Sequence, residues 1–219
     1  MFTAAQAVSW VRASAAVIED QAAALTKLDA AIGDGDHGTN MNRGFKAALQ
    51  RLDGLEAGDF GSVFKAVGMA LISKVGGASG PLYGSFYLAM GKQLGDADTV
   101  EDAELAAALR AGYDGVVARG KAQLEDKTML DAWHPALEAL DAALAGGSDL
   151  GQALDQAERA AEAGMKATIP LVARKGRASY LGERSRDHQD PGATSTHLLV
   201  KALADVVNQR YVDPSPTIW

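Results

Sequence analysis

The sequence predicts an all-α fold, a single-domain barrel or bundle of eight antiparallel helices. The chain is rich in Ala, Leu, Glu and Gln, which favour helix. Apolar residues recur with helical spacing, and the alternating runs of β-branched residues that are typical of strands are scarce. With 219 residues, the chain fits one domain with a sizeable core.

The expected helices follow one another with short connections. The first begins near the N-terminus and runs on through the Ala/Leu-rich stretch ALTKLDAAI. Pro135 and Pro170 fall inside the sixth and seventh helices, so we expect a kink or an early end there. We take residues 1–211 as the helical domain and 212–219 as a loose C-terminal tail. The eight expected helices are 3–31, 40–52, 60–75, 81–94, 100–119, 127–145, 149–172 and 194–210.

Composition and charge exclude several classes of protein. The net charge is −7, so no nucleic-acid partner and no polybasic membrane patch are expected. The chain has no cysteine, which excludes disulfides and thiol chemistry. Gln6, Ser9 and Arg12 interrupt the apolar positions of the N-terminus, which therefore does not resemble a signal peptide. No apolar run approaches the ~20 residues that span a bilayer, so we expect a cytoplasmic protein.

The connections between helices differ in chemistry. Short connections make successive helices antiparallel, so every second connection lies at the same end of the bundle. The connections after the first, third, fifth and seventh helices are the unusual ones, whereas the other three are ordinary Gly/Asp turns. One end of the bundle is therefore predicted to be a functional site. The four unusual connections contain an Asp cluster at 29–36, the run GGASGP at 76–81, residues 119–127 and the long basic run 173–195.

The Asp cluster predicts a magnesium site. Asp29, Asp34 and Asp36 lie within eight residues. Carboxylates packed this densely repel one another unless a cation lies among them, and Mg²⁺ takes one or two protein carboxylates together with water and substrate phosphates. The next residues, Gly38, Thr39 and Asn40, begin a helix, and free N–H groups at a helix N-terminus bind anions. Adjacent metal and phosphate sites suggest a Mg-nucleotide.

Other interpretations of this stretch fit less well. Residues 33–38 match the dinucleotide-binding fingerprint G-x-G-x-x-G, but that motif must follow a β-strand, and a helical pattern precedes it here. An EF-hand loop beginning at Asp34 would place Phe45 where the bidentate Glu is needed. A polar capping turn is the simplest alternative. A cap uses one such residue, so three acids and a His are more than a cap needs.

Two further connections carry groups suited to phosphate. The Gly-rich run 76–81 supplies backbone amides that can form a nest for phosphate oxygens. Ser79 either gives a hydroxyl to a phosphate or caps the next helix, and Ser is strongly preferred at caps. Arginine is suited to bidentate phosphate recognition, although a charge run is also typical of a solvated loop. The basic run contains Arg174, Lys175, Arg177, Arg184 and Arg186.

The histidines and the turn at 190–192 remain to be assigned. Imidazole suits Zn and Fe better than Mg²⁺, so we interpret His37 as a phosphate donor. His134 and His197 lie within helices and are interpreted as structural, whereas the role of His188 is open. Asp190 begins a turn before the last helix and could accept a hydrogen bond from a ribose hydroxyl or a base.

Taken together, four motifs resemble one family, the nucleotide-binding L subunit (DhaL) of dihydroxyacetone kinase. The resemblance extends from about Trp10 to the last helix, and its last motif is long and specific. It implies a barrel of eight antiparallel helices with nucleotide and Mg²⁺ at one end. The motifs are LDAAIGDGDHGTNMNRGF (28–45), VGGASGPLYG (75–84), GKAQLEDKTMLDAW (120–133) and ARKGRASYLGERSRDHQDPGATS (173–195).

The resemblance also implies roles for individual residues. It implies Mg²⁺ on Asp29, Asp34 and Asp36. Arg177 would reach toward the transferring phosphoryl group. The phosphates would contact His37, Gly38, Thr39, Asn40, Ala78 and Ser79. The nucleoside part would contact Gly120, Met129, Asp190, Pro191 and Gly192.

The implied function is one half of a two-part kinase. In the family, dihydroxyacetone is bound on a separate K subunit, and 219 residues leave no room for that domain. In the phosphotransferase-system (PTS) version, ADP stays bound and a phosphocarrier M subunit rephosphorylates it, which a free-standing L chain favours. The alternatives are an ATP-exchanging subunit, a different short-chain ketose or fatty-acid partner, and a nucleotide-loaded protein that docks a transcription regulator.

Overall fold

The computed structural model describes residues 1–53, 55 and 58–212. Within these residues the protein is a single, mostly helical domain with two short strands, β1 (Phe2–Thr3) and β2 (Thr99–Val100). A 3₁₀-helix, η1 (Arg177–Ser185), lies in the basic run. The α-helices are α1 (Ala4–Asp20), α2 (Ala22–Ile32), α3 (His37–Leu52), α4 (Phe60–Lys74), α5 (Ser79–Leu94), α6 (Asp102–Gly120), α7 (Leu130–Ala145), α8 (Leu150–Ala167) and α9 (Pro191–Val207).

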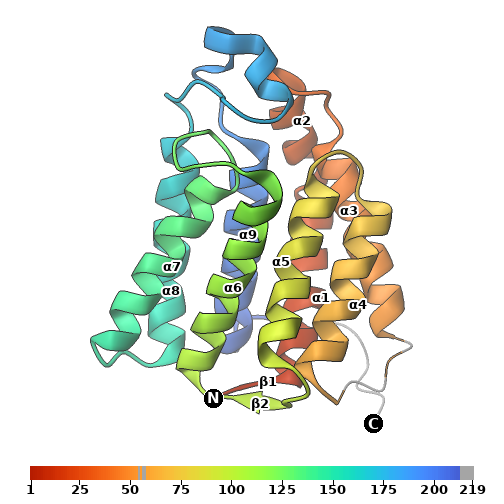
Figure 1. Ribbon diagram of the computed structural model, residues 1–219, viewed down its shortest axis with the longest axis vertical. Coiled ribbons are helices and arrows are strands. Elements are labelled where there is room, and N and C mark those ends of the chain that lie inside the picture. Colours follow the sequence, from red (N-terminus) through yellow and green to blue (C-terminus); the bar gives the residue numbers. More distant parts are fainter. Residues whose placement is uncertain (54, 56–57, 213–219) are drawn as a thin grey trace.

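The long helices run side by side along the molecule (Figure 1). From α3 to α9, each helix packs against the next one in the chain, and α1 packs against both α3 and α9. The short helix α2 contacts α3, α9 and η1 instead. In Figure 1, α2 and η1 lie at the upper end, whereas β1 and β2 lie at the lower end. The two ends of the bundle therefore differ.

Aromatic side chains fill the centre of the bundle. Trp10 of α1 is fully buried, and its ring lies 6.0 Å from Phe64 and 5.6 Å from Tyr87. The Trp10 indole N–H donates to the Leu199 carbonyl at 2.9 Å, which ties α1 to α9. Each large apolar side chain buried in this way contributes about 1.5–3 kcal/mol. Packing in the core therefore fixes the helices relative to one another, and with them the loops at the helix ends.

The prediction of one continuous helix over residues 3–31 is wrong. It is divided at Gln21, which adopts φ −91° and ψ 5° and links α1 to α2. No Gly or Pro marks this joint in the sequence. Because α2 packs on η1 and α9, tertiary contacts redirect the chain here. Counting this break, the described residues contain nine α-helices rather than the expected eight.

Three helices begin earlier than expected. The expected starts at 40, 81 and 194 are replaced by His37, Ser79 and Pro191. Proline is tolerated in the first turn of a helix because its missing N–H would have no partner there. Pro81 and Pro191 therefore lie inside the first turns of α5 and α9 and do not precede them.

The two interior prolines have different outcomes. The helix α8 ends at Ala167, before Pro170, so the expected early end is confirmed. In contrast, α7 continues through Pro135 to Ala145. Of the expected tail, residues 213–219 lie outside the described residues. No helix among those described combines the length and the apolar character needed to cross a membrane.

Candidate functional site

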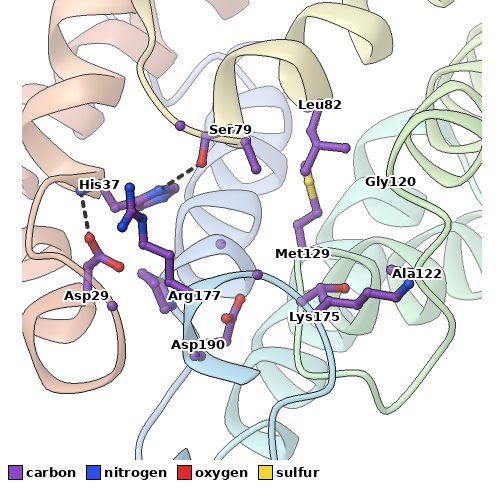
Figure 2. A pocket seen from close by; sticks show the side chains of 18 of the residues that line it. Asp29, His37, Ser79, Leu82, Gly120, Ala122, Met129, Lys175, Arg177 and Asp190 are labelled. Carbon is purple, nitrogen blue, oxygen red and sulfur yellow. Dashed lines mark hydrogen bonds between the residues drawn. The ribbon is translucent and has the colours of Figure 1, made fainter. Parts of the chain in front are cut away.

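A cavity of about 440 Å³ opens at the end of the bundle that carries α2 and η1. All four unusual connections line it, so the prediction that they share one end is confirmed. Figure 2 shows Asp29, His37 and Arg177 at one side of the cavity and Leu82, Met129 and Lys175 at the other. The lining segments are 29–40, 76–83, 116–130, 175–178 and 190–192, each in part.

The Asp cluster is gathered by a close turn between α2 and α3. One carboxylate oxygen each from Asp29, Asp34 and Asp36 lies within 4.8 Å of the others. Asp29 is buried in the last turn of α2, and its Oδ2 accepts the backbone N–H groups of Asp36 at 2.8 Å and His37 at 3.1 Å. A Cβ on Gly33 would lie 2.1 Å from Asp29 Oδ1, so a side chain there would displace the Asp29 carboxylate.

This geometry bears on the competing interpretations of the Asp cluster. Asp36 is the N-cap residue of α3 but makes no side-chain capping hydrogen bond, and among the described side chains Asp29 alone accepts the N–H groups at this helix start, so the cluster holds more acids than the cap uses. The helix α2 precedes the motif, as expected, which excludes the dinucleotide-binding fingerprint. Three hard oxygen ligands at this spacing suit Mg²⁺, which also takes water and phosphate oxygens. Arg177 Nε lies 2.9 Å from Asp34 Oδ2.

His37 joins three helix starts through its ring. Its Nδ1 lies 3.1 Å from Ser79 Oγ of α5, and its Nε2 lies 2.9 Å from Ser195 Oγ of α9. Ser195 Oγ lies 2.7 Å from the Tyr83 hydroxyl, which also contacts Thr196 Oγ1 at 3.0 Å. Burial lowers the pKa of His37 to about 4, against the opposing effect of nearby Asp residues. The imidazole is therefore neutral at pH 7 and has one donor and one acceptor nitrogen.

The Gly-rich connection brings the start of α5 to the cavity. Ser79 is the first residue of α5, after the N-cap residue Ala78, and no side chain caps this helix. The interpretation of Ser79 as a cap is therefore wrong, because its hydroxyl contacts His37. Gly77 has φ 65°, the left-handed conformation that glycine adopts without strain. The first-turn amides of α5 have no partner within the helix and can bind an anion.

Most residues at the other side of the cavity are apolar. Gly120 ends α6, and Met129 is the N-cap residue of α7. Leu82 Cδ2 lies 2.9 Å from the position of a Cβ on Gly120, so a side chain there would displace it. This wall suits a flat, apolar group such as a nucleobase. Its residues are Leu82, Val116, Gly120, Ala122, Met129 and Leu130.

Asp190 caps the last helix from inside the protein. Its Oδ2 accepts the Ala193 N–H at 2.7 Å, and Pro191 and Gly192 form the first turn of α9. Burial raises the pKa of Asp190 to about 7, while the backbone N–H groups and the Lys127 ammonium favour its charged form. The side chain is 7% exposed, so little of it faces solvent.

The basic run is only partly at the cavity. Lys175 and Arg177 line it, whereas Arg174, Arg184 and Arg186 are not among its lining residues. Arg186 instead donates to Glu183 and to the Pro170 carbonyl. The Arg177 side chain is 64% exposed, so it can move toward a bound group.

Two residues predicted at the phosphates do not line the cavity. Gly38 is buried against the Ala22 carbonyl, and Thr39 lines a separate groove with Arg43 and Lys46. The two histidines interpreted as structural lie within α7 and α9 and are not among the residues that line the cavity. The ring of His134 lies 5.9 Å from that of Tyr113, and His197 Nε2 lies 2.8 Å from Glu158 Oε1.

Sequence reasoning missed four residues at the site. Tyr83, Ser195 and Thr196 complete the His37 network, and Lys127 is a buried cation at the cavity wall. Their positions within the conspicuous motifs were the available signal, since Tyr83, Lys127 and Ser195 all occur in them. Their partners are distant in sequence, so no local pattern identifies their roles.

Known proteins share both the sequence and the fold of this chain. Residues 31–205 match the DAK2 domain. The chain is 45% identical over 201 residues to the ADP-binding subunit DhaL of the PEP-dependent dihydroxyacetone kinase of Escherichia coli (strain K12), covering 91% of this chain and 95% of that protein. It is 42% identical over 207 residues to the ADP-binding subunit DhaL of the PTS-dependent dihydroxyacetone kinase of Lactococcus lactis subsp. lactis (strain IL1403), covering 94% and 100%.

A solved structure agrees with this relationship. The native dihydroxyacetone kinase of C. freundii superimposes with a TM-score of 0.71 at 28% identity, over 94% of this chain and 35% of that one. The same kinase in complex with AMP-PNP and Mg²⁺ gives a TM-score of 0.69 at 30% identity, over 90% of this chain and 33% of that one. This chain therefore belongs to the DAK2 domain family, in the group that contains the DhaL subunits.

Proposed function

We propose that this chain is the nucleotide-binding subunit of a dihydroxyacetone kinase. It holds Mg-ADP or Mg-ATP in the cavity and transfers the phosphoryl group to dihydroxyacetone on a separate K-type subunit. The observation that carries the proposal is the convergence on one cavity of three carboxylates, two helix starts and Arg177. The names of its relatives, which are ADP-binding DhaL subunits, support it.

The metal would be held by Asp29, Asp34 and Asp36. Bound Mg²⁺ would neutralise the charge of the nucleotide phosphates and the carboxylates together. Asp29 has a further task, because its Oδ2 already accepts two backbone N–H groups at the start of α3. This leaves Oδ1 for a cation. The carboxylate therefore fixes the metal site relative to the helix start.

The phosphates would lie between the starts of α3 and α5. Asn40 and Ser79 line the cavity beside His37, and the amides of Ala78 and Ser79 are close by. Neither Gly38 nor Thr39 is among the residues that line the cavity, but both lie in the first turn of α3, so we retain only their backbone amides as proposed phosphate contacts. Arg177 would exchange its ion pair with Asp34 for the transferring phosphoryl group, where its charge stabilises the transfer.

The nucleoside would lie against the apolar wall. Gly120 and Met129 provide part of its surface, and Leu82 lies beside Gly120 in the same wall. The turn of Asp190, Pro191 and Gly192 forms the floor between this wall and the phosphate side. The wall itself is made of apolar residues, which suits a base held by packing, and the cations Arg119, Lys127 and Lys175 line the cavity beside it.

The phosphoryl donor distinguishes two versions of the function. We propose that bound ADP is rephosphorylated by a PTS-type phosphocarrier M subunit in the cytoplasm. The support is that the relatives are named as subunits of PEP-dependent or PTS-dependent kinases. The alternative is exchange of ADP for ATP. Relatives such as D-erythrulose kinase of Mycolicibacterium smegmatis (38% identical, 34% of that protein covered) make another short-chain ketose a second candidate substrate.

The order in which the helices pack supports a barrel of eight helices. We propose that α1 and α3–α9 form the eight-helix barrel that the resemblance implies, with α2 as an addition at the site end. The support is the closed order of neighbours, in which α9 returns to α1. We also keep residues 1–211 as the functional domain.

The deciding experiment counts product per chain. Purified alone with ATP, Mg²⁺ and dihydroxyacetone, the chain should form no dihydroxyacetone phosphate. Adding the cognate K subunit should permit one turnover from an ATP-loaded site. Sustained turnover should then need a phosphohistidine-bearing carrier.

Three outcomes would contradict this proposal. Robust product from the chain alone would overturn the two-part kinase. Product far above one per chain with K and excess ATP would replace the phosphocarrier version with the ATP-exchanging one. If nucleotide binds but no transfer occurs with any carrier, a role in docking a transcription regulator becomes the better candidate.

A further inference from the structure

Lys127 is a buried cation in the connection between α6 and α7. The residue is 1% exposed. Its Nζ donates to the backbone carbonyls of Thr168 at 2.8 Å, Leu171 at 3.0 Å and Ile169 at 3.3 Å, and to that of His188 at 2.5 Å. An ammonium has three N–H donors and no acceptor, so these four oxygens occupy it fully.

The four carbonyls lie at both ends of one segment. Thr168 is the C-cap residue of α8, and Ile169 and Leu171 follow it. His188 lies just before Asp190, the N-cap residue of α9. The last carbonyls of a helix carry partial negative charge and lack partners within the helix, so a cation stabilises them. Lys127 therefore joins the end of α8 to the chain that enters α9.

Other hydrogen bonds close the base of the same loop. Asp187 N donates to Ile169 O at 2.8 Å, and Asp190 N donates to Thr168 Oγ1 at 3.0 Å. Ala173 N donates to the buried Ser185 Oγ at 2.8 Å. Residues 168–190 thus form a loop with closed ends, which we call the arginine loop because Arg177 lies in its distal part. Lys127 lies between the two ends.

Resting on the proposed function, we infer that Lys127 is a positioning residue that keeps the arginine loop closed at its base and so holds Arg177 over the phosphate side of the cavity. Its contacts with both ends of the loop distinguish it from a residue that only caps α8. The ion pair of Arg177 with Asp34, at 2.9 Å, shows where the closed loop delivers the guanidinium. Burial lowers the pKa of Lys127, and the charge of Asp190 opposes this shift.

The test combines hydrogen exchange with phosphoryl transfer in the full chain loaded with Mg-ADP or Mg-ATP. Lys127→Met keeps the length of the side chain and removes its donors. Lys166→Met is the matched control, because Lys166 is exposed in the last turn of α8, the helix whose end Lys127 contacts. The probes are the amides of Ala173 and Asp187 in the loop base and those of α5 in the core.

In Lys127→Met, we expect the loop-base amides to exchange at least tenfold faster, with core amides and the control variant unchanged. Transfer to K-bound dihydroxyacetone should fall about 10²-fold, the effect of a small misplacement of a catalytic group, while ADP retention changes much less. If Lys127→Met does not fold, Lys127→Gln, which keeps an amide donor, should show the same selective loss at the loop base.

Several results would overturn the inference. One is that Lys127→Met leaves the exchange of the loop-base amides unchanged. Another is that exchange becomes faster in the loop and in the core alike. A third is that the loop-base amides exchange faster but phosphoryl transfer stays at the wild-type rate. Failure of the proposed function gives a different pattern. In that case the wild-type chain transfers nothing, while the exchange measurement alone still decides whether Lys127 closes the loop.

Discussion

Replacing Asp190 by asparagine should make the stability of this protein less dependent on pH. Asp190 is buried, and burial raises its pKa from 3.8 to about 7. In the folded protein its carboxyl group therefore stays protonated between about pH 4 and 7, whereas in the unfolded chain it ionises. The stabilisation from this group is complete below its unfolded pKa and is lost as pH rises through about 7.

The expected size follows from the shift. Raising a pKa from 3.8 to about 7 is roughly three units, each about 1.4 kcal/mol, so ionised Asp190 costs the folded state about 4 kcal/mol at pH 8. The asparagine side chain in Asp190→Asn does not ionise and keeps an oxygen for the Ala193 N–H, which Asp190 accepts at 2.7 Å. Relative to wild type, Asp190→Asn should gain about 4 kcal/mol between pH 4 and pH 8.

The assay is urea unfolding of the nucleotide-free protein at pH 4.5, 6 and 8, with wild type and variant measured together. The difference between them cancels the other titrating groups that the substitution leaves unchanged. Asp59→Asn is the control, because Asp59 is a partly exposed N-cap residue whose pKa is lowered by its bonds to Ser62. Its substitution should cost stability above about pH 4 and lose that effect at lower pH.

A stability difference between Asp190→Asn and wild type that is the same at all three pH values would refute this reasoning. It would mean that Asp190 is ionised in the folded state at pH 5, stabilised by Lys127 and by the amides of α9. A gain that appears only as pH falls would reverse the sign and refute it equally.

Three further predictions concern the nucleotide site. Asp29→Asn keeps an oxygen for the amides of Asp36 and His37 but removes a charge. Isothermal titration should show loss of Mg-dependent ADP binding, and the circular dichroism spectrum should remain helical. Unchanged ADP affinity would contradict the metal assignment. Removing ADP and adding EDTA should lower the melting temperature by several degrees, because a ligand at 1,000 times its Kd adds about 4 kcal/mol to the free energy of unfolding. A melting curve that neither treatment changes would exclude a nucleotide from the native state. Arg177→Ala should slow phosphoryl transfer, measured by rapid quench, about 10³-fold, because a charge-stabilising arginine acts on the transferred group. ADP retention should weaken far less. Equal losses in the two assays would make Arg177 a residue that binds the nucleotide in the ground state.

The sequence identified the site end but not the whole of the site. The three acids lie within eight residues at an expected turn between two helices, so Asp29, Asp34 and Asp36 could be predicted as a cluster. The alternation of antiparallel helices then placed the Gly-rich and basic connections beside them. Both arguments depend only on short distances along the chain and on helix direction, which local patterns determine.

The partners of individual side chains could not be predicted in this way. His37 was expected to donate to phosphate, but its ring contacts Ser79 and Ser195, 42 and 158 residues away. The sequence suggested Ser79 as a helix cap, although its hydroxyl faces His37. Propensities describe what a residue does on its own helix and carry no information about which helix start lies opposite.

Sequence alone thus determined a helical chain with its unusual loops at one end, because helical periodicity and loop composition are local properties. Tertiary structure decided the break at Gln21, where α2 leaves the line of α1 to pack on η1 and α9. It also decided that Lys127, a charged residue in a loop, is buried. The carbonyls that make this burial possible come from residues 41 to 61 positions away, and only the packed fold brings them to one point.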